Sequence, residues 1–289
     1  MAGATVTPGL VVVDKSPGMT SHDVVARVRR LAGTRKVGHA GTLDPMATGV
    51  LVLGVDRATR LLGHLMLTEK AYDATLRLGA STTTDDAEGD VVATTSTDGV
   101  REDDVRAELA RLVGDIEQVP TAVSAIKVDG KRAYARVRDG EQVELKARPV
   151  TIHEIVVHEV SLPDVRISVR CSSGTYVRAI ARDVGAALGV GGHLTALRRT
   201  AVGSFDLTVA HTLDQLSDDL TVLPMADAAR STFPGVDLDD EQAAHVRFGR
   251  ALHLALPGPG PHAVFAPDGE FLALYEARGE KAKPVAVFV

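Results

Sequence analysis

The sequence lacks several features that would point to particular classes of protein. Its single cysteine, Cys171, excludes an internal disulfide framework and a cysteine-cluster metal site. No hydrophobic run approaches the length of a membrane span, and near the N-terminus only residues 10–13 form a short apolar run, so we expect no signal peptide. With 45% hydrophobic and 24% charged residues, the chain is predicted to be a soluble globular protein of the cytoplasm.

Aromatic side chains are also scarce. Tryptophan is absent, and among the first 204 residues the only Phe, Trp or Tyr residues are Tyr72, Tyr134 and Tyr176. Each lies within two residues of a lysine or arginine, a pairing typical of sites that stack bases and bind phosphates. For any one of them, half-buried packing with a hydrated hydroxyl is the simpler interpretation. The occurrence of the pairing at all three favours a nucleic-acid site.

The formal net charge of −6 argues against a nucleic-acid partner when it is taken alone, but the charges are segregated. Residues 27–36 hold five basic side chains and no acid, and residues 166–200 hold six arginines against one aspartate. Residues 81–118 hold eleven acids against three arginines. A solvated acidic face and a separate basic face would explain this pattern, and the basic face would then be a groove that binds phosphates. Scattered, solvated arginines are the simpler interpretation and are slightly favoured.

The segment from Gly38 to Val50, GHAGTLDPMATGV, holds one carboxylate inside a glycine-rich loop. Pro45 disfavours the helical region for Asp44 and removes the next backbone donor, while the glycines allow close approaches that a Cβ would block. Such a loop could present Asp44 to a substrate. Local physics gives even weight to another interpretation, in which Asp44 is a helix N-cap with Pro45 in the first turn.

Apolar periodicity predicts short strands and helices. Strands are expected at 10–14, 50–55, 70–78, near 91, 150–160 and 165–171, and helices at 20–32 with a Thr20–Asp23 capping box, 57–67, 102–113 and 176–188. They alternate without the steady rhythm of a parallel sheet, which favours a mixed, largely antiparallel α+β fold with flanking helices.

Two segments depart from this pattern. Residues 123–148 are rich in Lys, Arg and Gly with weak periodicity, so we expect an excursion from the core. Residues 214–241 hold eight acids and one arginine and predict a boundary with solvated helices, after which short strands separated by Pro and Gly suggest a small β domain. The predicted domains are residues 1–230 and 231–289.

The segment 38–50 resembles the signature of the TruB-type tRNA pseudouridine synthases, which is close to G-H-x-G-x-L-D-P-x-A-T-G-x-L. Supporting segments occur in the family's order: DKSPGMTS at 14–21, KAY at 70–72, SAIK at 124–127 and CSSGTYVR at 171–178. The resemblance covers residues 9–207 well, and the last forty residues resemble the family's small PUA domain. Ala40 and Thr121 depart from the common threonine and proline.

By this resemblance, the protein would be an isomerase that converts uridine 55 in the T-loop of tRNA to pseudouridine, without cofactor or metal. Asp44 would be the catalytic aspartate, acting either as a nucleophile at C1′ or as a base at C2′, with Arg178 as its cationic partner. An adjacent cation lowers the pKa of a carboxylate and so opposes the effect of desolvation.

The resemblance also implies the groups that would hold RNA. Tyr72 would stack on the flipped base and take part in catalysis, Tyr176 and Leu197 would complete the pocket, and His39 would fill space in the refolded RNA. Lys15 and Arg60 are further candidates for substrate binding. The insertion at 123–148 would clamp the T-loop through Lys127, Lys131, Arg132 and Tyr134, while residues 27–36 and Arg198–Arg199 would contact phosphates.

The expected partner is the T-arm of tRNA, bound by a monomer that needs no protein partner and no membrane. Three alternatives remain: an RNA-binding tRNA folding factor with secondary catalysis, a ribonucleoside hydrolase, and a guide-RNA-dependent pseudouridine synthase. The absence of a second acidic residue in these motifs counts against hydrolysis, and the basic insertion favours the stand-alone enzyme.

Overall fold

The computed structural model describes residues 7–121, 127–128, 131–132 and 145–289. A ten-stranded mixed sheet forms its main layer, in the order β14-β1-β3-β12-β4-β11-β10-β7, with β2 paired to β3 and β13 paired to β12. All neighbours are antiparallel except β12 and β3. The structure confirms the predicted α+β class. The strands are β1 (Gly9–Lys15), β2 (Val37–His39), β3 (Thr48–Val55), β4 (Lys70–Leu78), β7 (Gly114–Gln118), β10 (Arg148–Ser161), β11 (Asp164–Cys171), β12 (Gly192–Val202), β13 (Phe205–Asp206) and β14 (Leu223–Pro224).

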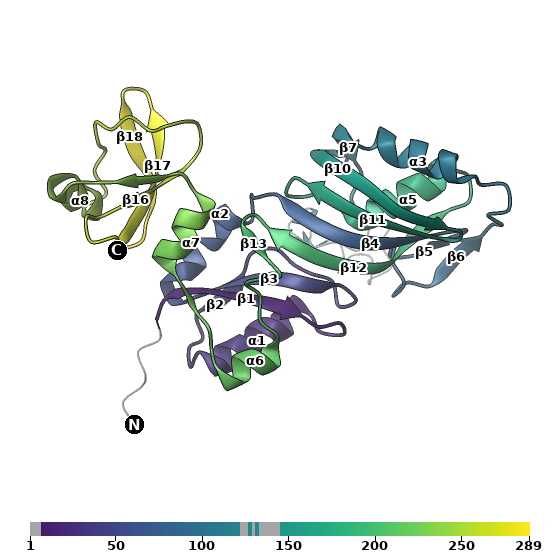
Figure 1. Ribbon diagram of the computed structural model, residues 1–289, viewed down its shortest axis with the longest axis horizontal. Helices are drawn as coiled ribbons and strands as arrows, with labels where there is room; N and C mark the ends of the chain where they lie inside the picture. Colours follow the sequence, from purple (N-terminus) through teal and green to yellow (C-terminus); the bar gives the residue numbers. More distant parts are fainter. Residues whose placement is uncertain (1–6, 122–126, 129–130, 133–144) are drawn as a thin grey trace.

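Alternating apolar residues place one face of the sheet under helices. In β4 the side chains of Tyr72, Ala74, Leu76 and Leu78 are buried, and the intervening ones are more exposed. Helices α3 (Glu102–Arg111) and α5 (Val177–Ala187) cover this face (Figure 1) and share its apolar cluster. The sequence therefore predicted both the strand and the face that it buries.

Strands β1 and β3 are buried on both faces, because apolar layers lie on each side of them. One layer contains α1 (Ser21–Leu31) and α6 (Leu213–Asp218), which lie side by side in Figure 1. The predicted capping box of α1 is present, with Thr20 as N-cap and Asp23 as its partner. Gly33, at φ +62°, follows the end of this helix, as expected for a glycine that stops a helix.

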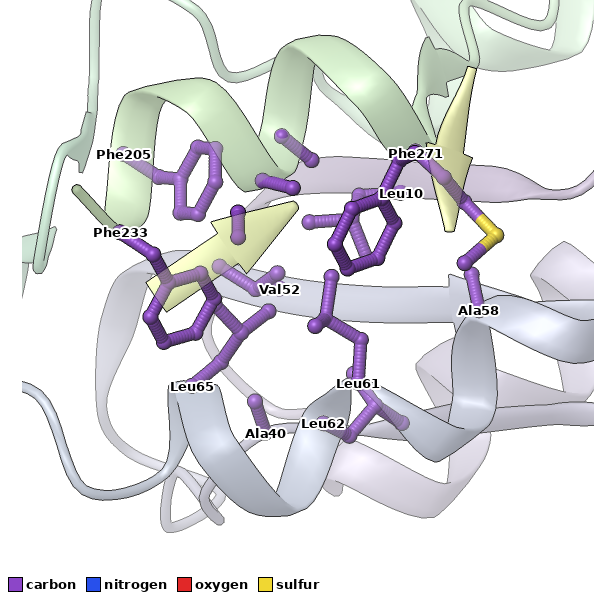
Figure 2. Close-up of a cluster of buried hydrophobic side chains, with 14 of the residues drawn as sticks. Leu10, Ala40, Val52, Ala58, Leu61, Leu62, Leu65, Phe205, Phe233 and Phe271 are labelled. Carbon is purple, nitrogen blue, oxygen red and sulfur yellow. The ribbon is translucent and has the colours of Figure 1, made fainter. Parts of the chain in front are cut away.

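The second layer joins the main sheet to the C-terminal sheet (Figure 2). Leu10 and Val52 pack there with Phe233 and Phe271, in one cluster that also includes Phe288. The C-terminal sheet runs in the order β15 (Gly235–Asp237), β16 (His262–Phe265), β17 (Phe271–Arg278) and β18 (Lys281–Val287), and α8 (Asp240–Arg247) packs against it. The two sheets thus share part of one hydrophobic core.

Two local predictions need correction. Instead of a helix over 57–67, the chain forms a 3₁₀ turn η1 (Asp56–Arg60) and the one-turn α2 (Leu62–Leu65); neither has a side-chain cap, and Gly63 weakens the second. The expected strand near 91 is present as β6 (Val91–Thr94), which is exposed and pairs with β5 (Ala80–Thr82).

Helix α7 (Met225–Thr232) lies within the acidic stretch that predicted solvated helices, but its apolar face is buried against the shared core. The sequence periodicity of such a short helix was masked by the acids around it. In the part of the chain that the structure describes, no helix is both long and apolar enough to cross a membrane.

We predict that Phe288→Ala lowers the free energy of unfolding by about 3–5 kcal/mol, measured by chemical denaturation. The ring is 1% exposed and lies 4.9 Å from the Phe271 ring, so its loss leaves a cavity in the shared core. The matched control is Phe248→Ala, because that ring is 77% exposed; its effect should stay within about 0.5 kcal/mol. Equal effects of the two substitutions would contradict the shared core.

Candidate active site

Asp44 lies in the irregular loop that connects β2 to β3. The N–H of Ala47 donates to the carbonyl oxygen of Asp44 at 3.1 Å, which closes one turn, and the chain then enters β3 at Thr48. No helix follows, so the interpretation of Asp44 as a helix N-cap is wrong. The loop instead presents the carboxylate at the edge of a cavity.

Three buried side chains hold the backbone of this loop. The ammonium of Lys15 donates to the carbonyls of Pro45 and Ala47, at 3.2 and 2.6 Å. The guanidinium of Arg199 donates to the carbonyls of Gly41, Thr42 and Val50, at 3.2, 3.3 and 2.7 Å. The Ser21 hydroxyl donates to the Leu43 carbonyl at 3.0 Å and accepts from the Leu43 N–H at 2.8 Å. These contacts fix the loop on both sides of Asp44.

Gly49 allows the chain to pass close to Arg199. It adopts φ +95°, and a Cβ there would lie 2.2 Å from the Arg199 carbonyl oxygen. Glycine alone tolerates both the left-handed backbone and this approach without strain. The glycine punctuation in the sequence therefore has a direct structural cause at this position.

Arg178 reaches Asp44 from the first turn of α5. Its Nη2 lies 3.2 Å from Oδ2 of Asp44, and its Nη1 lies 3.1 Å from Oδ2 of Asp86 and 2.9 Å from the Thr84 carbonyl. The side chains of Arg178 and Asp86 are only 7% and 3% exposed. A buried guanidinium thus bridges two carboxylates, one buried and one at the cavity.

Sequence reasoning named Arg178 but missed Asp86. It counted the stretch 81–118 as a solvated acidic face, whereas Asp86 is buried and accepts hydrogen bonds from the Thr84 hydroxyl and the Glu88 N–H. The available signal was local: Asp86 follows three threonines and Asp85, and hydroxyls near a carboxylate often order a turn.

The pKa of the Asp44 carboxyl is raised above its ordinary value. Burial is the largest cause; the Arg178 charge opposes it, the Asp86 charge adds to it, and Lys15 and Arg199 lower it. The sequence interpretation expected a cation to oppose desolvation, and that cation is present, but burial outweighs it. The carboxyl is therefore more readily protonated than an exposed aspartate.

The cavity beside Asp44 has a volume of about 310 Å³. Tyr72, Tyr176 and Leu197, predicted to form a pocket, line it together with Asp44 and Arg178. The remaining lining residues are Gly41, Thr42, Leu43, Met66, Lys70, Ser173, Gly174, Thr175, Val177 and Arg199. Burial raises the pKa of the Tyr72 hydroxyl, and the neighbouring Arg199 opposes that effect.

Several predicted contact residues lie elsewhere. Lys15 is fully buried beneath the loop, so its predicted role in substrate contact is corrected to a structural one. Arg60 lies on η1, where it donates to the Val287 carbonyl and its guanidinium is 5.4 Å from the Phe288 ring centroid; it joins the two sheets and does not line the cavity. His39 lies on β2, and its ring forms an edge contact with that of His22 at 5.6 Å.

The predicted phosphate contacts also divide. Arg199 is 1% exposed and binds the loop backbone, so its predicted role in phosphate contact is corrected to that of a loop anchor. Arg198 forms an ion pair with Asp14 at 2.7 Å. Arg27, Arg30 and Arg35 are exposed. In the predicted clamp, Lys127–Val128 (β8) and Lys131–Arg132 (β9) pair as antiparallel strands, whereas Tyr134 and the clamp side chains lie outside what is described.

Within the described residues, no group of three or more His, Cys, Asp or Glu side chains could hold a metal ion. The described site offers the chemistry of a partly buried carboxylate, its arginine partner, a phenol and a lysine, which line one cavity.

Comparison with known proteins identifies relatives along the whole chain. Residues 29–177 match the model of the TruB family pseudouridylate synthase N-terminal domain, residues 178–230 the tRNA pseudouridylate synthase B C-terminal domain, and residues 233–289 the tRNA pseudouridine synthase II C-terminal domain. The tRNA pseudouridine synthase B of Streptomyces griseus is 58% identical, with 100% of both chains covered. That of Arthrobacter sp. is also 58% identical, with 97% of this chain and 96% of the relative covered.

Solved structures with the same fold include RNA-protein complexes. One is a Cbf5-Nop10-Gar1 complex, with TM-score 0.76 and 29% identity over 98% of this chain and 86% of that chain. Another is an H/ACA RNP bound to a substrate RNA containing 2′-deoxyuridine, with TM-score 0.75 and 26% identity over 97% of this chain and 85% of that one.

We predict that Gly49→Ala lowers the free energy of unfolding by about 2–4 kcal/mol, because the methyl group meets the Arg199 backbone at a strained φ. The control is Gly63→Ala in α2, where a Cβ would meet nothing within 4 Å. Alanine should be neutral there or stabilise by up to about 1 kcal/mol. Urea denaturation measures both; a harmless Gly49→Ala would contradict the close approach.

Proposed function

Because the chain belongs to the TruB family of pseudouridylate synthases, we propose that it isomerises uridine 55 in the T-loop of tRNA to pseudouridine, with Asp44 as the catalytic carboxylate. The observation that carries this proposal is the position of Asp44: an anchored loop holds it at the wall of a cavity, and the buried Arg178 contacts it at 3.2 Å.

The reaction breaks the N1–C1′ bond of uridine, turns the base, and joins C5 to C1′. A carboxylate serves this chemistry in one of two ways: Asp44 attacks C1′, or it removes the proton from C2′. Both need the ionised form, so the nearby cations matter because they oppose the effect of burial on the pKa of Asp44. The contact between Arg178 and Asp44 also fixes the direction of the carboxylate.

The target nucleotide must leave the base stack before Asp44 can reach it, at a cost of a few kcal/mol. The proposal assigns part of the compensation to Tyr72, since stacking on an aromatic ring contributes about 1–3 kcal/mol per base. Tyr176 and Leu197 supply the other walls. The cavity volume of about 310 Å³ suits one flipped base better than a longer segment of RNA.

The remaining surfaces receive roles by the same proposal. Residues 1–230 form the catalytic domain, and residues 123–148 clamp the T-loop through Lys127, Lys131, Arg132 and Tyr134. Residues 231–289 form the small PUA-like domain. Exposed arginines of α1 contact phosphates and His39 fills space in the refolded loop. The protein acts in the cytoplasm as a monomer on the T-arm, without a guide RNA.

A guide-dependent reaction is the second candidate, because the RNA-protein complexes named above share the fold over most of the chain. The tRNA enzyme is favoured, since the relatives that bear that name are 58% identical and match nearly end to end. The assays below use purified protein and unmodified tRNA alone, so a guide requirement would appear as inactivity of the wild type.

We predict that Asp44→Asn abolishes pseudouridine formation and leaves tRNA affinity within about threefold, because the amide keeps the shape of the side chain and removes its charge. Tritium release from 5-³H-uridine tRNA measures the reaction, and filter binding measures affinity. The control is Asp98→Asn, in the exposed turn before α3. An active Asp44→Asn enzyme would exclude Asp44 as the catalytic group.

We predict two effects of Asp86→Asn. The maximal rate falls about tenfold or more, because Arg178 loses a buried anchor and positions Asp44 less well. The acid limb of the pH–rate profile moves to lower pH, because the Asp86 charge raises the pKa of Asp44 and the asparagine lacks that charge.

The matched control is Asp85→Asn, since the Asp85 carboxylate pairs with Arg182 at 3.3 Å. Single-turnover rates between pH 5 and 8 measure both effects. If the two variants have the same profile, Asp86 does not act on Asp44 through Arg178.

A further inference from the structure

Lys70 is a buried cation in the cavity wall that the reaction described above does not use. It is 8% exposed and begins β4, two residues before Tyr72 and on the same face of the strand. Its ammonium donates to the carbonyls of Met66 and Thr68, at 2.9 and 2.8 Å. Since an ammonium has three donors, these two bonds leave a third, and Lys70 lines the cavity.

No carboxylate balances this charge within the described residues. The groups that act most strongly on Lys70 are Arg199 on β12, which repels it, and Cys171 on β11, whose own pKa is raised to about 11 so that it stays neutral. Burial and Arg199 lower the pKa of Lys70 to about 8. A buried cation without an anionic partner costs stability, and such costs persist mainly at functional sites.

Lys70 and Arg199 converge on one part of the cavity. From the position that a Cβ of Gly41 would occupy, Cε of Lys70 lies at 3.9 Å and Nη1 of Arg199 at 3.7 Å. Arg178 contacts Asp44 and Asp86 from α5. Among the described residues in and behind the walls, the carboxylates of Asp44, Asp86 and Glu88 act on Arg178 or Lys15, whereas none of them is among the groups that act on Lys70.

The geometry points to Lys70 as a further catalytic residue, whose ammonium stabilises the negative charge that the uracil ring carries after the N1–C1′ bond breaks. When that bond breaks, its electron pair leaves with the base and spreads from N1 to O2 and O4. The ribose is then bonded at C1′ to an oxygen of Asp44, or has lost its C2′ proton to Asp44. In the first case C5 attacks C1′ and the bond from C1′ to the Asp44 oxygen breaks; in the second, C5 bonds to C1′ and C2′ regains its proton from Asp44. The C5 proton then departs and N1 ends protonated, so atoms and charge balance without a co-reactant.

This role rests on the proposed function and adds to it, because it gives the buried charge of Lys70 a part in the reaction that neither Asp44 nor Arg178 takes. Cations that are already in place stabilise charge that develops in the transition state more than charge in the substrate. The effect of removing Lys70 should therefore fall on the maximal rate more than on tRNA affinity. A purely structural lysine that holds the Met66–Thr68 turn would instead alter stability and affinity.

The test compares Lys70→Met, Lys70→Arg and a surface control, Lys36→Met, whose lysine is exposed and pairs with Asp56 at 3.2 Å. Single-turnover rates with saturating enzyme are measured from pH 6 to 9.5, with thermal unfolding in parallel. The rates of the wild type and of Lys36→Met should fall as the pH rises, with a midpoint near pH 8, as Lys70 loses its proton. Lys70→Met should be at least tenfold slower at pH 7 and should lack this decline.

Lys70→Arg should extend the plateau above pH 8, because a guanidinium stays charged there. A wild-type rate for Lys70→Met, or an unchanged decline in Lys70→Arg, would overturn the role. If Lys70→Met fails to fold, the profile of Lys70→Arg still decides. A wild type that makes no pseudouridine would refute the proposed function itself, whereas an active wild type with an unmoved decline refutes only the role of Lys70.

Discussion

The anchoring of the Asp44 loop by buried cations is the constraint on which the site depends. Lys15 and Arg199 bind backbone carbonyls on both sides of Asp44, and the Ser21 hydroxyl binds the residue before it. These donors come from the end of β1, from β12 and from α1, which are parts of the central core. Packing of the sheet therefore determines the position of a single carboxylate, and the loop has little freedom to move it.

The buried charges around Asp44 have opposing effects on its pKa. Burial raises the pKa of Asp44, which disfavours the ionised form, and Arg178, Lys15 and Arg199 oppose that effect. Asp86 balances Arg178 from the buried side, so the guanidinium is not left unpaired. Lys70, which also lines the cavity, has no carboxylate among the described groups that act on it.

Sequence predicted the parts of this arrangement that depend on local pattern. The capping box of α1, the alternation in β4 and the glycine-rich loop around Asp44 are visible in the order of residues. Arg178 and the pocket residues Tyr72, Tyr176 and Leu197 came from resemblance to a family, and the structure places all four at one cavity with Asp44.

The sequence does not show which charged side chains are buried by contacts between residues far apart in the chain. Asp86 lies in an acidic stretch, and in the fold it pairs with Arg178 of α5, 92 positions away. Lys15 and Arg199 were predicted to contact RNA, but they anchor the loop, because β3 lies between β1 and β12 in the sheet. The mapping of pseudouridine in unmodified tRNA after incubation with the purified protein alone tests the account most directly: we predict one product, at position 55, and no product or a product elsewhere would contradict it.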